Sequence, residues 1–408
     1  NHIPDKHRQQ LINLCEEFKD IFSSSNFDIG KTDLIEHKIQ VASIPPSQKQ
    51  RFMCGEKLKF ATEACEKLLN ADIIKICENP LTVGNLVLVA KYEEFRDNTK
   101  ALKLNSNQKI RGYRLAQDFR LVNQATLNVQ RVSATHIDDF ISKIQGKIIS
   151  SLDVTQGYFN IKLAEQSQPL TAFYLGKKTY CWKRMSQGLI SSGHTWDELM
   201  TKTFEKKAME EIKSKIKEQI EDAKKKNIST PNKFNDFLSS YVDDLFTYSD
   251  DYESQLICLR ITFMAIRRAK LKLSAKKCKF MTKEINILGY TLNSENTELF
   301  IDRAKAEAII NWDPPSSAYE LQSRLFSLAY FTKFLPKCKQ TIYPLLHILR
   351  TKQFVWTEIE NKAWEAMKTL IKMDIRLTIP KKTDQLFLFS DASKIGCSQI
   401  LFVKQGNE

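Results

Sequence analysis

The sequence lacks several features that would by themselves define a class of protein. Only 12 of its 408 residues are glycine, and no glycine-rich loop of the kind that cradles a phosphate is present. No run of about 18 apolar residues occurs, so no membrane-spanning helix is expected. The chain starts at Asn1 without a leader segment, and we expect it to be a piece of a longer protein.

Cysteine and histidine are present but not in metal-binding patterns. The nine cysteines and six histidines are scattered, and no C-x-x-C pair occurs. This spacing excludes a zinc site of the usual kind and does not predict a disulfide framework. We therefore expect reduced thiols and an intracellular protein.

Positive charge is in excess. The 62 Lys and Arg residues outnumber the 48 Asp and Glu residues, giving a formal net charge of +14. Two explanations remain open: a lysine-rich intracellular protein, or a polyanionic partner whose counterions are released when Lys and Arg replace them. At roughly 100–200 residues per domain, the length predicts two to four domains.

The hydrophobic pattern predicts an α+β chain. Apolar residues at helical spacing mark the segments 8–23, 56–76, 204–223, 317–336 and 357–372. Strands are expected at 35–41, 86–90, 113–116, 148–152, 238–249 and 386–389. The strands at 86–90 and 113–116 flank a polar, lysine-rich connection, which indicates a long hairpin.

Two predicted apolar strand segments carry aspartates at their ends or turns. Asp153 follows the strand at 148–152, and Asp243 and Asp244 lie inside the hairpin at 238–249. Adjacent aspartates are also common turn formers, and this alternative stays open. If the two segments are neighbours, three carboxylates converge, which is costly unless cations neutralise them. Mg²⁺ shares such sites with substrate phosphates, so the pattern predicts phosphoryl transfer on nucleic acid by a metal pair.

Several blocks occur in the order found in reverse transcriptases and resemble the motifs of that family. They are Tyr113-Arg114-Leu115, Asp118-Phe119-Arg120-Leu121-Val122-Asn123, Ser151-Leu152-Asp153-Val154-Thr155-Gln156-Gly157-Tyr158, Thr171-Ala172-Phe173, Ser186-Gln187-Gly188-Leu189, Tyr241-Val242-Asp243-Asp244, Lys277-Cys278-Lys279-Phe280 and Leu288-Gly289-Tyr290. Segments 314–334 and 354–357 resemble the thumb and tether of gypsy-type long-terminal-repeat retrotransposon polyproteins. The departures from the family pattern are a missing proline before Gln187 and longer stretches at 92–112 and 206–236.

The resemblance implies an α+β right-hand polymerase with fingers, palm and thumb, in which an antiparallel palm sheet carries the Asp-Asp hairpin. The domains expected from it are an N-terminal extension (1–50), fingers and palm (51–295), a helical thumb and tether (296–378) and a truncated ribonuclease H start (379–408). Asp391 matches the first acid of that incomplete ribonuclease H site. We therefore expect no hydrolysis of RNA in a hybrid.

The resemblance also implies roles for individual residues. Asp153 and Asp243 would hold two Mg²⁺ or Mn²⁺ ions, with Asp244 as a supporting acid. The other implied roles are sugar selection by Tyr158, triphosphate binding by Arg114 and Lys91, nucleotide or template contact by Gln187, proton donation by Lys277, and a primer grip at Leu288, Gly289 and Tyr290. For each of these other residues a purely structural role, or for Lys277 a phosphate-backbone contact, remains open.

The sequence-based hypothesis is therefore an RNA-directed DNA polymerase. Its partners would be an RNA or DNA template, a primer, RNA–DNA hybrid, deoxynucleoside triphosphates and the remainder of a polyprotein, with a dimer left open. The cytoplasm, a virus-like particle and the nucleus all remain open as its location. Two alternatives are a catalytically silent nucleic-acid-binding or scaffold relic, and an RNA-templated polymerase from an intron or non-LTR element.

Overall fold

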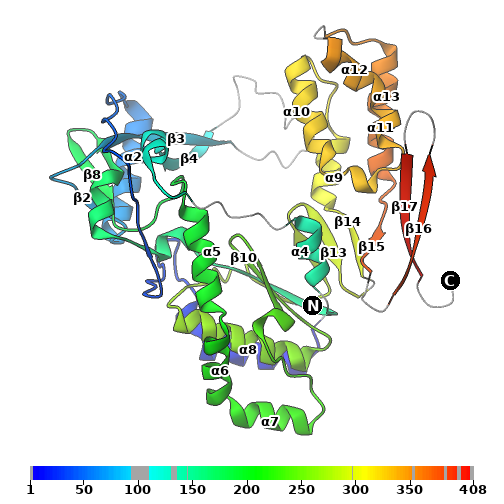
Figure 1. Cartoon of the computed structure of the whole chain (residues 1–408), viewed down its shortest axis with the longest axis horizontal. Helices are drawn as coiled ribbons and strands as arrows, with labels where there is room; N and C mark the ends of the chain where they lie inside the picture. Colours follow the sequence, from blue (N-terminus) through cyan, green and yellow to red (C-terminus); the bar gives the residue numbers. More distant parts are fainter. Residues whose placement is uncertain are drawn as a thin grey trace. The chain divides into compact units, whose positions relative to one another are not determined.

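The chain forms two compact units, each of which mixes helices with strands (Figure 1). The computed structural model describes residues 3–92, 110–129, 136–144, 146–295, 297–351, 354–380, 384–392 and 397–404. Of the described residues, those up to 282 form the first unit and those from 283 onward form the second. The predicted α+β class is confirmed, while the four predicted domain boundaries stay predictions.

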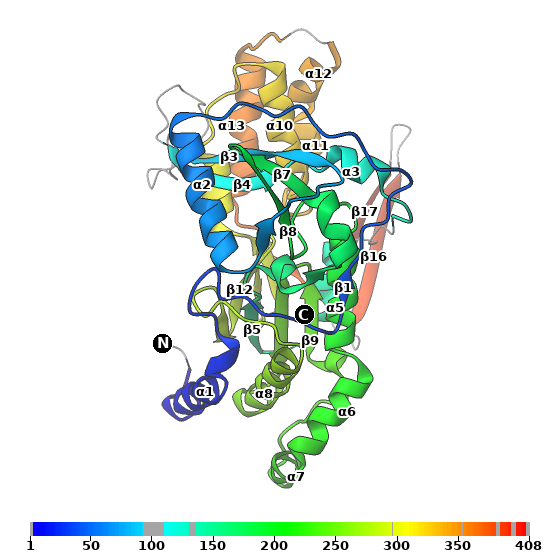
Figure 2. The ribbon, with the colours of Figure 1, turned by 90° about the vertical axis from the view of Figure 1, so that its left-hand side faces the viewer.

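The first unit is built on an antiparallel sheet, here called the central sheet, with the strand order β11-β5-β10-β9. Its strands are β5 (Ile148–Asp153), β9 (Leu238–Tyr241), β10 (Asp244–Ser249) and β11 (Lys279–Thr282). Leu152 and Leu245 face each other across the β5–β10 ladder and are buried. Helix α8 (Tyr252–Arg268) packs on β10, and helix α1 (Asp5–Glu17) packs on α8 (Figure 2).

A second sheet of the first unit, here called the outer sheet, has the strand order β2-β8-β7-β3-β4. Its strands are β2 (Ile74–Ile76), β3 (Val83–Tyr92), β4 (Ile110–Gln117), β7 (Ala172–Leu175) and β8 (Lys178–Trp182). Strands β3 and β4 pair as the predicted hairpin, whose connecting loop lies outside the described residues. The expected helix at 56–76 is too long: α2 (Gly55–Asn70) ends earlier, and the following segment turns at Asp72 (φ +58°) into β2.

Shorter elements complete this unit. They are η1 (Lys19–Ile21), β1 (Glu36–His37), α3 (Arg120–Ala125), α4 (Ile137–Lys143), η2 (Gly157–Asn160), β6 (Lys162–Leu163), η3 (Glu165–Thr171), α5 (Ser192–Thr203) and η4 (Phe234–Asp236). The expected strand at 35–41 is therefore reduced to a two-residue parallel pairing of β1 with β6.

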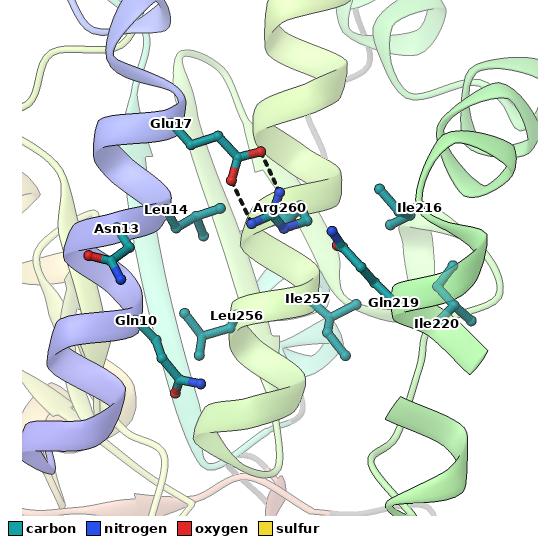
Figure 3. Close-up of a pocket in the computed structure, with 10 residues that line it drawn as sticks. All are labelled: Gln10, Asn13, Leu14, Glu17, Ile216, Gln219, Ile220, Leu256, Ile257 and Arg260. Atoms are coloured by element: carbon teal, nitrogen blue, oxygen red, sulfur yellow. Dashed lines mark hydrogen bonds and ion pairs between the residues drawn. The ribbon is translucent and has the colours of Figure 1, made fainter. Parts of the chain in front are cut away.

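The segment predicted as one helix at 204–223 forms two, α6 (Lys206–Lys215) and α7 (Lys217–Lys225), which separate at Ile216. Their apolar stripe is buried, and α6 packs on α8. A groove of about 290 Å³ lies between α1, α7 and α8 (Figure 3). Its only two charged lining residues, Glu17 and Arg260, are paired with each other through two hydrogen bonds.

The second unit contains an antiparallel sheet in the order β12-β13-β14-β15 and a group of helices. The strands are β12 (Glu284–Ile287), β13 (Tyr290–Asn293), β14 (Glu298–Ile301) and β15 (Leu377–Thr378). The helices are α9 (Arg303–Ile310), α10 (Ala318–Ala329), η5 (Thr332–Phe334), α11 (Cys338–Thr341), α12 (Tyr343–Thr351) and α13 (Glu358–Lys372). Trp364 of α13 is fully buried, and α13 packs on α9 and α12.

The chain ends in an antiparallel hairpin of β16 (Gln385–Ala392) and β17 (Cys397–Lys404). The predicted strand at 386–389 is confirmed within β16. Asp391 is exposed on this strand, opposite Ser398. In the part of the chain that the structure describes, no helix is long and apolar enough to cross a membrane.

Candidate active site

The three predicted aspartates meet at one end of the central sheet. Asp153 is the last residue of β5 and Asp244 the first of β10, and the two are directly paired across the antiparallel ladder. Asp243 precedes Asp244 in the tight turn that joins β9 to β10. Cβ atoms of directly opposed residues lie about 4.5–5.5 Å apart, so residues 91 positions apart in the sequence present their carboxylates together.

The crowded carboxylates disfavour one another's charged form. Burial, followed by repulsion from Asp244 and Asp153, raises the pKa of Asp243 above its usual value. Burial and repulsion from Asp153 raise the pKa of Asp244 as well, whereas Lys277 acts in the opposite direction on both. The Oδ1 atom of Asp243 is buried without a hydrogen-bond partner. Such an atom costs free energy unless a donor or a cation satisfies it.

A lysine partners the first of the three acids. Lys277 Nζ donates to Asp153 Oδ1 at 3.1 Å and to Oδ2 at 3.2 Å. Lys277 lies in the short turn before β11, where its N–H donates to the carbonyl of Ser274. Among the described residues, no group of three or more His, Cys, Asp or Glu side chains stands ready to hold a metal ion. Because Lys277 already pairs with both oxygens of Asp153, a cation that entered this site would compete with the Lys277 ammonium for that carboxylate.

The loop that follows Asp153 is clamped by Asn160, which the sequence analysis missed. Asn160 is fully buried, and its Nδ2 donates to the carbonyls of Thr155, Gln156 and Gly157 at 2.9, 3.1 and 3.0 Å. Its Oδ1 accepts from Gly30 N–H at 2.6 Å. The only sequence signal was a polar residue flanked by apolar ones, which is too common to single out a position.

Tyr158 lies close to Asp243, and its role in sugar selection remains a prediction. Its ring is half-buried and meets the Trp196 ring edge-to-face, with 6.0 Å between centroids. Burial and the nearby Asp243 carboxylate raise the pKa of Tyr158. Trp196 is a second residue that the sequence analysis missed. It is buried, and its indole Nε1 donates to the carbonyl of Val242 at 2.6 Å.

The proposed triphosphate ligands lie on the outer sheet. Arg114 is exposed on β4 and is paired in the ladder with Val89. Of Lys91 the structure describes the backbone, which pairs with Gly112 on β4. The two residues share the predicted hairpin, and their role remains a prediction.

The loop around Gln187 is anchored although it lacks the proline of the family pattern. Met185 and Ser186 are buried, whereas Gln187 is exposed. Asn123 of α3 donates from its Nδ2 to the carbonyl of Gly188 at 2.9 Å and accepts from Ile190 N–H at 3.0 Å. The motif blocks at 118–123 and 186–189, separate in sequence, are thus in direct contact.

The predicted primer grip is a tight turn in the second unit. Leu288 and Gly289 connect β12 to β13 with φ of +50° and +90°, a left-handed conformation that glycine adopts without steric cost. The Tyr330 hydroxyl donates to the Leu288 carbonyl at 2.9 Å. Tyr290 stacks on Tyr330 at 4.8 Å, so the turn is held firmly by aromatic packing.

Comparison with known proteins places this geometry in a family. Residues 102–292 match the family model described as reverse transcriptase (RNA-dependent DNA polymerase). These residues form a reverse transcriptase domain. They include all three aspartates, Tyr158, Gln187, Lys277 and the primer-grip turn.

The curated relatives of this chain are polyproteins. It is 22% identical over 405 residues to the retrovirus-related Pol polyprotein from transposon 297 of Drosophila melanogaster, covering 98% of this chain and 34% of the relative. It is 28% identical over 361 residues to the Pro-Pol polyprotein of simian foamy virus type 1, covering 87% of this chain and 27% of the relative. The resemblance to LTR-retroelement polyproteins is confirmed, and this chain spans about a third or less of their length.

Solved structures show the same fold. The foamy viral protease-reverse transcriptase in complex with double-stranded DNA superimposes with a TM-score of 0.81 at 18% identity, covering 100% of this chain and 76% of that chain. The same viral protein in complex with RNA/DNA hybrid gives a TM-score of 0.74, covering 98% of this chain and 50% of that chain. The predicted right-hand polymerase fold is therefore confirmed.

Proposed function

We propose that this chain is an RNA-directed DNA polymerase whose active site is formed by Asp153, Asp243 and Asp244. The observation that carries the proposal is the ladder pairing of Asp153 with Asp244, which brings the acids of two separate motifs to one sheet end. The family of residues 102–292 and the nucleic acids bound by the foamy viral structures support an RNA or DNA template, a primer and a hybrid as partners.

The acid cluster has the chemistry of a magnesium site. Burial, followed by repulsion among the carboxylates, raises the pKa values of Asp243 and Asp244, and Asp243 Oδ1 has no hydrogen-bond partner. A bound cation would relieve both the repulsion and the missing partner. Asp153 and Asp243 would hold two Mg²⁺ or Mn²⁺ ions, with Asp244 as the supporting acid. When bound, the two metal ions would activate the primer 3′-hydroxyl and neutralise negative charge on the triphosphate.

The other side chains would position the nucleotide. The ring of Tyr158, held edge-on by Trp196, would exclude a ribose 2′-hydroxyl. Lys277, already close to Asp153, would donate a proton to the departing pyrophosphate. Arg114 would form a bidentate contact with phosphate and Lys91 a single charged one. Gln187 would contact the nucleotide or template, and the Leu288–Gly289–Tyr290 turn would hold the primer.

Primer extension tests the proposal. We expect the chain to extend an oligo-dT primer on a poly-rA template with Mg²⁺ and deoxythymidine triphosphate. Asp243→Asn should reduce the rate by about a thousandfold or more, because the site loses a charge it needs, while hybrid binding is kept. Asp197→Asn, an exposed acid on α5, is the matched control and should extend normally.

The assay also distinguishes the main alternative. A parent chain that binds hybrid but never extends the primer would indicate a catalytically silent nucleic-acid-binding relic. An Asp243→Asn variant as fast as the parent would remove the three aspartates from the active site.

A further inference from the structure

The turn that carries Asp243 is held by a tryptophan from a different element. Trp196 lies in α5, is 3% exposed, and donates its indole N–H to the Val242 carbonyl at 2.6 Å. That carbonyl belongs to the peptide group that continues into Asp243. The orientation of this peptide group therefore sets the direction in which the Asp243 side chain leaves the backbone.

The turn needs such support because of the residue at its tip. Val242 has a φ of +53°, a left-handed conformation that β-branched residues rarely adopt, since their branched Cβ crowds the backbone. The Val242 side chain is 59% exposed, so packing of that side chain contributes little to holding it. The part-buried hydrogen bond from Trp196 to its carbonyl opposes relaxation of the turn.

The same indole touches the loop on the other side of the site. A Cβ built on Gly157 would lie 2.9 Å from Trp196 Cη2 and 3.2 Å from Asp243 Oδ1, so only glycine allows this approach. The Trp196 ring also meets Tyr158 edge-to-face, at an interplanar angle of 87°. One side chain thus contacts the loop after Asp153 and, by its N–H, the turn before Asp244.

We infer that Trp196 is a positioning residue with two roles, each carried by a different group of its side chain. Its N–H sets the Val242–Asp243 peptide and hence the metal-binding acid, and its ring supports Tyr158 and hence sugar selection. The inference deepens the proposed function and rests on it. A purely structural tryptophan would affect folding stability and neither of these properties.

Two substitutions separate the role of the indole N–H from that of the ring. Trp196→Phe removes the N–H and keeps an aromatic ring beside Tyr158. We expect it to raise the Mg²⁺ concentration for half-maximal extension by about tenfold while discrimination against ribonucleotides stays within about twofold. Trp196→Leu removes both features, and we expect it to raise the Mg²⁺ requirement and to reduce discrimination by about tenfold as well.

Trp182 provides the matched control. It is also 3% exposed, lies in the same unit, and donates its indole N–H to Gln117 Oε1 at 2.6 Å. Trp182→Phe therefore deletes an indole hydrogen bond of the same length that does not involve the β9–β10 turn. We expect both Phe variants to lower the Tm, and only Trp196→Phe to change the Mg²⁺ requirement.

A rescue experiment excludes a general loss of structure. Asn tolerates the left-handed region far better than Val does, so Val242→Asn should relax the strain that Trp196 opposes. Asn at this position should thus keep the left-handed turn without help from Trp196. Added to Trp196→Phe, it should restore at least half of the lost Mg²⁺ affinity on a logarithmic scale. Failure of this rescue in a folded double variant would overturn the inference.

Intrinsic fluorescence gives a readout that does not depend on activity. Mg²⁺ titrated into the chain, without primer or nucleotide, should change the tryptophan emission in the parent and in Trp182→Phe but not in Trp196→Phe. A response retained in Trp196→Phe, no response in the parent, or an unchanged Mg²⁺ requirement would each overturn the inference. If the parent does not extend primers yet the response is lost only in Trp196→Phe, the positioning role stands and the polymerase proposal fails.

Discussion

At the scale of a single residue, Asp243 lowers the folding stability of the metal-free chain. Its carboxylate is largely buried, lacks a donor at Oδ1, and is repelled by Asp153 and Asp244. Each of these features opposes folding when no cation is present. The isosteric amide should therefore be better tolerated than the native acid.

We predict that Asp243→Asn raises the Tm of the metal-free chain on the order of 2 °C, because about 1 kcal/mol of repulsion and desolvation is removed. Calorimetry with and without Mg²⁺ measures this. Mg²⁺ should stabilise the parent and have little effect on the variant. A lower Tm for Asp243→Asn, with Asp197→Asn as control, would contradict the prediction.

Tyr158 carries the second prediction at this scale. Replacing Tyr158 with Val removes the ring that packs against Trp196 and opens space next to Asp243. We expect ribonucleotide incorporation to rise by about tenfold or more relative to deoxynucleotides, since a steric exclusion of a hydroxyl is lost. Single-nucleotide incorporation measures the ratio, and unchanged discrimination would leave Tyr158 an ordinary core residue.

At the scale of elements, Asp118 joins the end of the outer sheet to α3. Its side chain is 5% exposed and accepts from Arg120 Nε at 2.9 Å, from Arg120 Nη2 at 2.7 Å and from Arg51 Nη2 at 3.4 Å. The hydrogen bonds from Arg120 lower the pKa of Asp118 to about 2. Both guanidinium groups are largely exposed, so solvent screens part of this energy.

We predict that Asp118→Asn lowers the free energy of unfolding by about 1 kcal/mol at pH 7. Because the pKa in the folded state lies below the unfolded value of 3.8, the contribution is complete above pH 5 or so and is lost as the pH falls toward 2. Urea unfolding of parent and variant between pH 7 and pH 2.5 tests this. A difference as large at pH 2.5 as at pH 7, or an equal difference in the exposed-acid control Asp139→Asn, would contradict it.

Element boundaries were predicted where a local signal exists and missed where it does not. The helix at 357–372 was correct to within a residue, because Thr357 caps it and Glu360 completes a capping box. The 56–76 segment was wrong beyond Asn70. Its apolar residues Ile73 and Ile74 suit either a helix or a strand, and pairing of Ile74 with Trp182 of β8 decided in favour of the strand.

At the scale of the whole molecule, some of the positive side chains are paired with acids of the same chain. On α6 and α7, Lys206, Lys215 and Lys217 pair with glutamates four residues away. These lysines contribute little net field, so binding to a polyanion must depend on basic groups elsewhere on the net +14 chain.

We therefore predict that binding of an RNA–DNA hybrid weakens by about a hundredfold or more between 50 and 200 mM salt, because several phosphates exchange counterions for Lys and Arg. Fluorescence anisotropy with a labelled hybrid measures the slope. Replacement of Lys206 and Lys217 by Gln should leave the slope unchanged. A salt-independent affinity would contradict the prediction.

The sequence by itself determined the acids, the strands that deliver them and the order of the motif blocks. Alternation of apolar residues and turn chemistry are local properties, so Asp153 and Asp243 could be singled out before any fold was known. Only the tertiary structure decided that Asp153 faces Asp244, that Lys277 pairs with Asp153, and that Trp196 and Asn160 hold the two loops. Those contacts join residues far apart in the chain, and they arise from packing of the whole unit rather than from any short pattern.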